Sequence, residues 1–213
     1  MGSDKPAVKR KFKLIVAVVV VLAVTAVFCL LFEPLYYIAE AFADRGKFTA
    51  AAYTMRLSYF FDRDFDTLGD LCGYLGNSID GSDNDAKTQE QYVRYAEMRL
   101  THKEVEKLKI PEKRLDAYSS EYSHYLWILY IKGDTEKAKT KCIEEIEKSG
   151  RSTVAIQFLT SVINSGTDED KKWARDTVKK IIDEGPYYDG MEDEIDEYKR
   201  QLQSIMSDYE SSG

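Results

Sequence analysis

Histidines, cysteines and clustered carboxylates are the side chains of this chain that could do chemistry. The two histidines are His102 and His124, and Glu121 precedes His124 by three positions, which places both side chains on one face of a helix. Di-iron carboxylate bundles use two such pairs together with two further glutamates, whereas this chain has one pair. The spacing therefore predicts no metal site, and we interpret His124 as a surface or groove residue.

The acidic stretch from Asp80 to Asp85 has the composition of a calcium loop but not its pattern. An EF-hand that starts at Asp80 needs glycine at its sixth position and glutamate at its twelfth. Asp85 and Gln91 occupy those positions. We therefore expect a solvated loop over residues 76–85, whose sequence is Gly-Asn-Ser-Ile-Asp-Gly-Ser-Asp-Asn-Asp.

The three cysteines do not form a metal or redox motif. Cys29, Cys72 and Cys142 match no C-x-x-C spacing. Cys72 and Cys142 lie in apolar helical patterns, so we expect small core residues, with a disulfide between them as the alternative. The chain also lacks a nucleophile elbow, a P-loop, a dinucleotide fingerprint and an H-E-x-x-H motif. We therefore expect no enzyme activity, no metal and no cofactor.

Near the N-terminus, the run from Leu14 to Phe32 contains no charged residue. Its 19 residues are about the length that a helix needs to cross a hydrocarbon core of roughly 30 Å. The run has no polar face, which argues against a helix buried in a soluble core. The sequence predicts a transmembrane helix over residues 14–32.

The flanking charges predict the orientation of this segment. Residues 1–13 hold five basic groups and one acid, and the rest of the chain holds 25 basic and 36 acidic groups, a net charge of −11. By the positive-inside rule, residues 1–13 form a basic cytoplasmic tail and residues 33–208 an extracytoplasmic domain, followed by a flexible tail over 209–213. An acidic domain repels nucleic acid and anionic lipid surfaces, so no nucleic-acid partner is expected.

A cleaved signal peptide is the alternative to a membrane anchor. Residues 39–41 and 41–43 both match an A-x-A cleavage site. However, the apolar part of a signal peptide is usually about 7–15 residues long, and this run is longer. We therefore expect a single-pass protein of the cell membrane that keeps its anchor.

Apolar residues at helical spacing fill the rest of the chain, with short breaks between the segments. Asp64 is expected to cap the helix that follows it, and Pro111 is expected in the first turn of another. The expected helical segments lie at about residues 35–42, 48–59, 65–75, 86–100, 111–132, 136–148, 152–164, 168–183 and 190–208. The fold class is therefore all-α.

Two turns share the pattern G-x-x-x-x-A, at Gly46–Ala51 and at Gly133–Ala138. Residues 63–68 have a similar spacing but lack the glycine. Glycine permits a tight turn between antiparallel helices, and alanine five residues later allows their close approach. In the first hairpin, the residue types follow the order large, large, small, aromatic, glycine, aromatic and small. The residues are Leu35, Ile38, Ala39, Phe42, Gly46, Phe48 and Ala51.

This pattern resembles the tetratricopeptide-repeat family of helical hairpins. The resemblance extends over two or three degenerate units within residues 34–183, and in the later hairpin only Gly133 and Ala138 match. It implies a right-handed array of hairpins with a concave binding groove. An ordinary helical bundle whose turns use glycine is the alternative.

Tyrosine is abundant, with 15 copies, all after residue 32. Tyr118, Tyr122 and Tyr125 fall on one side of a predicted helix. Packing between helices is the first interpretation, with the hydroxyl groups at the edge of the core. The second is an aromatic surface for a peptide or glycan, which makes these three tyrosines the candidate partner-binding residues.

These observations favour a membrane-anchored, extracytoplasmic scaffold of tetratricopeptide-like type that binds a protein or peptide. Two other functions remain open at this point. One is binding or hydrolysis of a cell-envelope polymer, for which the acidic pairs and tyrosines are the only support. The other is an architectural role in a membrane complex, in which the segment Leu14–Phe32 makes the contacts.

Overall fold

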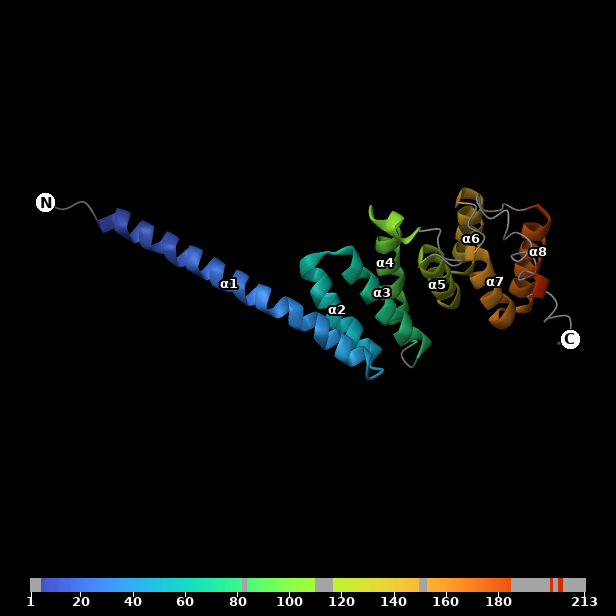
Figure 1. The fold of residues 1–213 in the computed structure, drawn as a ribbon, viewed down its shortest axis with the longest axis horizontal. Coiled ribbons are helices and arrows are strands. Elements are labelled where there is room, and N and C mark those ends of the chain that lie inside the picture. Colours follow the sequence, from blue (N-terminus) through green and yellow to red (C-terminus); the bar gives the residue numbers. More distant parts are fainter. Residues whose placement is uncertain are drawn as a thin grey trace. The chain divides into compact units, whose positions relative to one another are not determined.

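The described part of the computed structural model is built from helices (Figure 1). The structure describes residues 5–81, 84–109, 117–149, 153–184, 200, 203 and 204. Within these, the side chains of 5–14, 24–25, 27–33, 149 and 153–156 are not described. No strand occurs among the described residues, which confirms the all-α class.

The first helix, α1, extends from Lys5 to Ala43 and contains Pro34 (Figure 1). The helical hairpin domain therefore continues directly from the N-terminal helix, although proline lacks the N–H group that a helix interior normally uses. Among the described residues, no helix is both long enough and apolar enough to cross a membrane. Of the predicted spanning segment Leu14–Phe32, the side chains of residues 15–23 and 26 are described and the others lie outside the description.

The chain divides into two compact units, Met1–Tyr74 and Leu75–Gly213. In the first unit, α2 (Phe48–Asp62) packs against α1. The start of α3 (Phe65–Asp80) belongs to the same unit. Small residues allow close contact between these helices, since Ala39 and Ala51 are fully buried. Met55 is fully buried as well. The core is completed by Ala52, Tyr59, Phe65, Leu68, Leu71 and Cys72.

The expected loop over residues 76–85 is wrong in its first half, because α3 continues to Asp80. Leu75, Ser78 and Ile79 are buried, so this turn of helix contributes to the core of the second unit. Gly76 has no side chain, and a Cβ atom there would lie 2.5 Å from Cε1 of His124. Tertiary packing therefore outweighs the loop-forming composition of this stretch.

The second unit contains the end of α3 and the helices α4 (Ala86–Leu100), η1 (Val105–Leu108), α5 (Ala117–Ile131), α6 (Thr135–Ser149), α7 (Thr153–Ser165) and α8 (Asp168–Glu184). α5 is the central element, because it packs against α4, α6 and α7. Its buried residues accordingly lie on several sides of the helix. α7 also packs against α6 and α8 (Figure 1).

The three turns with a similar residue spacing, at residues 46–51, 63–68 and 133–138, also share a backbone conformation. Gly46 has φ +68°, Arg63 has φ +54° and Gly133 has φ +100°, all in the left-handed region. The residue five positions later is buried in each case, namely Ala51, Leu68 and Ala138. The predicted role of glycine is confirmed at two turns, and at the third an arginine takes the same conformation.

Hydrogen bonds at the two glycine turns follow the Schellman pattern that ends many helices. The amide of Lys47 donates to the carbonyl of Phe42 at 2.9 Å, and the amide of Asp134 donates to that of Leu129 at 3.0 Å. At the arginine turn, the carboxylate of Asp64 instead accepts from the amide of Asp66 at 2.9 Å. This bond confirms the predicted cap of α3.

Several predictions concern residues outside the description. They are the start of a helix at Pro111, the helix over 190–208 apart from residues 200, 203 and 204, and the tail over 209–213. The expected helices at 48–59, 86–100, 136–148, 152–164 and 168–183 correspond to α2, α4, α6, α7 and α8.

Candidate functional site

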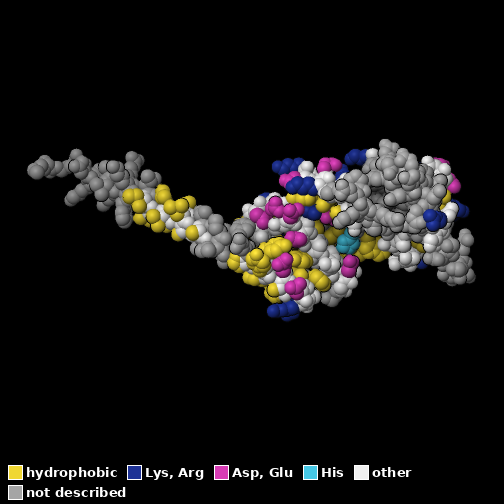
Figure 2. Space-filling view, viewed as in Figure 1, with side chains coloured by type: hydrophobic (Ala, Val, Ile, Leu, Met, Phe, Trp, Pro, Cys, Tyr) yellow, Lys and Arg dark blue, Asp and Glu magenta, His cyan; other side chains and the backbone are white. Residues whose placement is uncertain are grey.

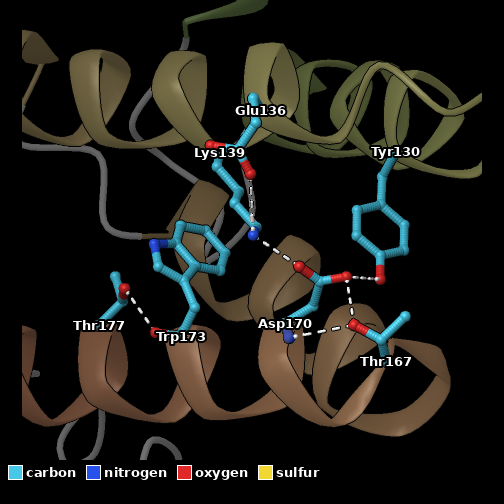
Figure 3. Close-up of polar contacts among 7 residues, drawn as sticks. All are labelled: Tyr130, Glu136, Lys139, Thr167, Asp170, Trp173 and Thr177. Atoms are coloured by element: carbon cyan, nitrogen blue, oxygen red, sulfur yellow. Dashed lines mark hydrogen bonds and ion pairs between the residues drawn. The ribbon is translucent and has the colours of Figure 1, made fainter.

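A connected polar cluster joins α5, α6 and the start of α8 (Figure 3). The carboxylate of Asp170 accepts hydrogen bonds from the hydroxyl groups of Tyr130 at 2.7 Å and Thr167 at 2.8 Å. Its other oxygen lies 2.6 Å from the ammonium group of Lys139, which also contacts Glu136 at 3.1 Å. Three segments of the chain are therefore held together by one carboxylate.

The electrostatics of this cluster keep both ions charged. Burial alone would raise the pKa of Asp170, but the hydrogen bonds from Lys139, Tyr130 and Thr167 outweigh it, and the pKa is lowered. Burial alone would lower the pKa of Lys139, but its hydrogen bonds to Asp170 and Glu136, together with the charges of these carboxylates, outweigh burial and raise the pKa. Neither pKa is shifted toward neutral pH, as that of a general acid or base would be.

Aromatic rings surround this ion pair. The ammonium group of Lys139 lies 5.3 Å from the ring centre of Trp173, a cation–π geometry (Figure 3). Phe158 of α7 lies between Trp173 and Tyr130, at 6.5 Å and 6.3 Å from their ring centres. Gly166 permits this arrangement, because a Cβ atom there would lie 2.8 Å from the hydroxyl oxygen of Tyr130.

A second polar cluster joins α4, α5 and α6. The hydroxyl of Tyr125 donates to Glu97 at 2.6 Å, and Lys137 lies 3.0 Å from the same carboxylate oxygen. Burial would raise the pKa of Glu97, but these two contacts lower it. Burial and the bond to Glu97 raise the pKa of Tyr125. The carboxylate therefore stays ionised and the phenol stays protonated at neutral pH.

The three candidate tyrosines lie together but are not equally accessible. Tyr118 stacks on Tyr122 with ring centres 5.6 Å apart, and Tyr122 contacts Tyr125 at 5.8 Å. Tyr118 and Tyr125 are buried, at 6% and 1% exposure, and Tyr122 is half-buried. Packing between helices therefore accounts for this group. The assignment of these tyrosines to a partner stays a prediction.

The pair Glu121 and His124 does not converge on one point. Glu121 accepts two hydrogen bonds from Arg99, at 2.8 Å and 3.0 Å. His124 has Nδ1 3.1 Å from the hydroxyl of Tyr92, and its Nε2 lies 3.5 Å from the carboxylate of Asp80. Burial lowers the pKa of His124 despite Asp80. Among the described residues, no group of three or more His, Cys, Asp or Glu could hold a metal ion.

Cys72 and Cys142 are both buried, and neither forms a disulfide. This confirms the interpretation as small core residues and excludes the alternative of a disulfide between them. Burial raises the pKa of the Cys142 thiol to about 12. A thiol that stays protonated at neutral pH is not an activated nucleophile.

Exposed and half-buried side chains recur on one side of α5 and on one side of α7, two helices that pack against each other, and the sequence did not single them out. On α5 they recur at helical spacing as Ser120, His124, Trp127 and Ile131, and on α7 as Gln157, Thr160, Ser161 and Asn164. Ser120 and Asn164 are exposed and the others are half-buried. We call these eight residues the α5–α7 surface. Trp127 stacks on Tyr130 at 5.5 Å, which fixes its ring.

This surface could have been found from the sequence only by knowing the neighbours of α5. The helix is apolar on several sides, so periodicity does not indicate which side faces solvent. On α7, the run of hydroxyl and amide side chains opposite buried Phe158, Leu159, Val162 and Ile163 is the available signal.

Comparison of the chain with protein-family models, with curated proteins and with solved structures gives no match.

Proposed function

We propose that this chain is a membrane-anchored, extracytoplasmic scaffold of tetratricopeptide-like type that binds a protein or peptide. The observation that carries the proposal is the α5–α7 surface, on two helices that pack side by side. Hairpin arrays of that family bind their partners on a surface made of successive helices. The turns at Gly46, Arg63 and Gly133, with a buried residue five positions later, support the same reading.

The chemistry of the α5–α7 surface suits an extended peptide. Gln157 and Asn164 carry amide groups that can both donate to and accept from a peptide backbone. Trp127 offers a ring already held by Tyr130, so little side-chain entropy is lost when a partner packs on it. We propose that these residues contact the partner and that Tyr118 and Tyr125 support α5 from within.

The anchor in this proposal is the uncharged run from Leu14 to Phe32. The basic residues of 1–13 and the strongly acidic remainder support an N-terminus in the cytoplasm and a domain on the other side of the membrane. The uninterrupted α1 supports a rigid connection between anchor and domain, because no flexible linker separates them.

A surface variant of the full chain tests the scaffold. Ser120→Arg together with Asn164→Arg adds bulk and charge to the α5–α7 surface without removing a buried side chain. Thr140→Arg, on an exposed position of α6, is the matched control. Affinity capture from detergent-solubilised native membranes should recover a defined protein with the wild type and the control, and lose it with the surface variant. Equal recovery with all three chains contradicts the proposal.

An anchor exchange separates the scaffold from an architectural role. Replacing residues 14–32 with an unrelated transmembrane helix should preserve capture of the same protein, because the contact lies on α5 and α7. If capture is lost while the exchanged chain remains folded and in the membrane, the anchor itself makes the contact.

A further inference from the structure

The outward side of α2 carries large apolar residues. Tyr53, Leu57, Phe60 and Phe61 recur at intervals of three and four, which places them on one face of the helix. Tyr53 is 61% exposed and Phe60 is 63% exposed. We call these four residues the α2 aromatic face. Figure 2 shows hydrophobic side chains gathered on the part of the molecule where α1 and α2 lie.

This face is not needed for the core of its unit. α2 packs against α1 with its other side, on which Ala51, Ala52, Met55 and Tyr59 are buried. A helix at the surface of a soluble domain normally carries polar residues on the side that faces away from the core. The apolar character of the outward side therefore calls for a second apolar environment.

The path of the chain indicates which environment that is. α2 turns back along α1 through the tight turn at Gly46. Phe60 and Phe61 lie about twelve residues into α2, or about 18 Å from this turn. An equal distance back along α1 reaches approximately residues 30–31, which are the end of the uncharged run. The end of α2 thus lies close to the level at which the proposed anchor leaves the membrane.

Local charge fits the same environment. Residues 45–63 contain four basic residues and one acid, in a domain with a net charge of −11. Arg56 lies 5.3 Å from the ring centre of Tyr53, and Arg63 lies 5.6 Å from that of Phe60. Aromatic rings with arginine beside them are typical of the headgroup region, where rings bury their faces and guanidinium groups reach phosphates.

We propose that the α2 aromatic face lies on the bilayer interface, with Phe60 and Phe61 among the lipid headgroups. The proposal rests on the proposed membrane anchoring by α1. It makes α2 a second contact with the membrane, of the kind that amphipathic interfacial helices make. The unit would then be held in a fixed orientation to the membrane, because two rigid helices contact it at different points.

Site-specific fluorescence tests this contact in the full chain. An environment-sensitive fluorophore is attached to Phe60→Cys in a Cys29→Ser background, since Cys72 and Cys142 are buried. The protein is reconstituted in vesicles of phosphatidylcholine and phosphatidylglycerol. Lipids that carry a nitroxide near the headgroup or deep in the chain report the depth of the label. Labels at Asp44→Cys and Val19→Cys are compared, because Asp44 is exposed at the turn and Val19 lies in the proposed anchor.

The expected result is several-fold stronger quenching at position 60 than at position 44, mainly by the shallow nitroxide, with position 19 quenched by the deep one. If position 19 is quenched but position 60 is quenched no more than position 44, the interface contact is overturned and the anchor is retained. Position 19 unquenched overturns both proposals. The emission of the label at position 60 could instead shift to the blue as the protein-to-lipid ratio rises, without quenching by the nitroxide lipids. That result shows a second copy of the chain on this face and also overturns the contact. Circular dichroism of each variant reports whether the chain is folded.

Discussion

The ion pair between Lys139 and Asp170 gives the sharpest prediction about stability. The two side chains are 13% and 11% exposed, and Asp170 also accepts hydrogen bonds from Tyr130 and Thr167. Removal of one partner from a buried pair costs about 3–5 kcal/mol. Asp170→Asn keeps an acceptor for the two hydroxyl groups, so we expect it to lower the free energy of unfolding by about 2–3 kcal/mol.

Lys139→Met is the reciprocal change. Methionine retains much of the aliphatic stem beside Trp173 but leaves Asp170 with two neutral donors. We expect a loss of about 2–3 kcal/mol here as well. In the double variant neither charge remains unpaired, so its loss should be smaller than the sum of the single losses by about 1–2 kcal/mol.

Urea unfolding followed by tryptophan fluorescence measures these free energies. The two tryptophans, Trp127 and Trp173, both belong to the second unit and lie near the cluster, so the signal reports on this unit. Glu136→Gln is the control, because Glu136 contacts the same ammonium group from an exposed position. Losses below about 0.5 kcal/mol for Asp170→Asn, or additive losses in the double variant, would refute the reasoning that the buried pair acts as a unit.

Three further predictions follow from the described contacts. Gly133→Ala should lower the free energy of unfolding by about 1–2 kcal/mol because the backbone at this position is left-handed. Gly73→Ala, in open space within α3, should raise it by about 0.5–1 kcal/mol. Denaturant unfolding followed by circular dichroism distinguishes the two signs. The pKa of Asp170 is lower in the folded chain than in the unfolded one, so its contribution to stability is complete above about pH 4 and is lost at lower pH. Asp170→Asn should therefore reduce the loss of stability below about pH 4 in a plot of unfolding free energy against pH. The Cys142 thiol, with its pKa near 12, should react with a thiol reagent at neutral pH only after unfolding; rapid labelling of the native chain would contradict this.

Local sequence signals predicted the helices that have a polar side and clear ends. The cap at Asp64, the glycine turns at Gly46 and Gly133, and the spacing within α6 and α8 are all short-range features, and the structure contains them. Signals of this kind depend on neighbours in sequence, so they are visible without knowledge of the fold.

Long-range contacts account for what the sequence did not reveal. Residues 76–80 have the composition of a loop, but they remain helical because Gly76 packs on His124, 48 positions away. Lys139 and Asp170 are 31 positions apart, and no local pattern pairs them. Tyr118 and Tyr125 were interpreted first as packing residues and second as partner-binding residues, and sequence spacing could not choose between the two. Both are buried, because α5 packs against three other helices that are distant in the sequence.

Photo-crosslinking in the native membrane tests the central claim most directly. A photoreactive amino acid at Trp127, on the α5–α7 surface, is compared with one at Thr140, on the exposed side of α6, and one at the half-buried Tyr122. The scaffold proposal predicts that one defined protein is crosslinked from position 127 and not from position 140. Crosslinking from position 122 alone would place the contact at the tyrosines instead. No product from position 127, in a chain that is folded and in its membrane, would contradict the proposal.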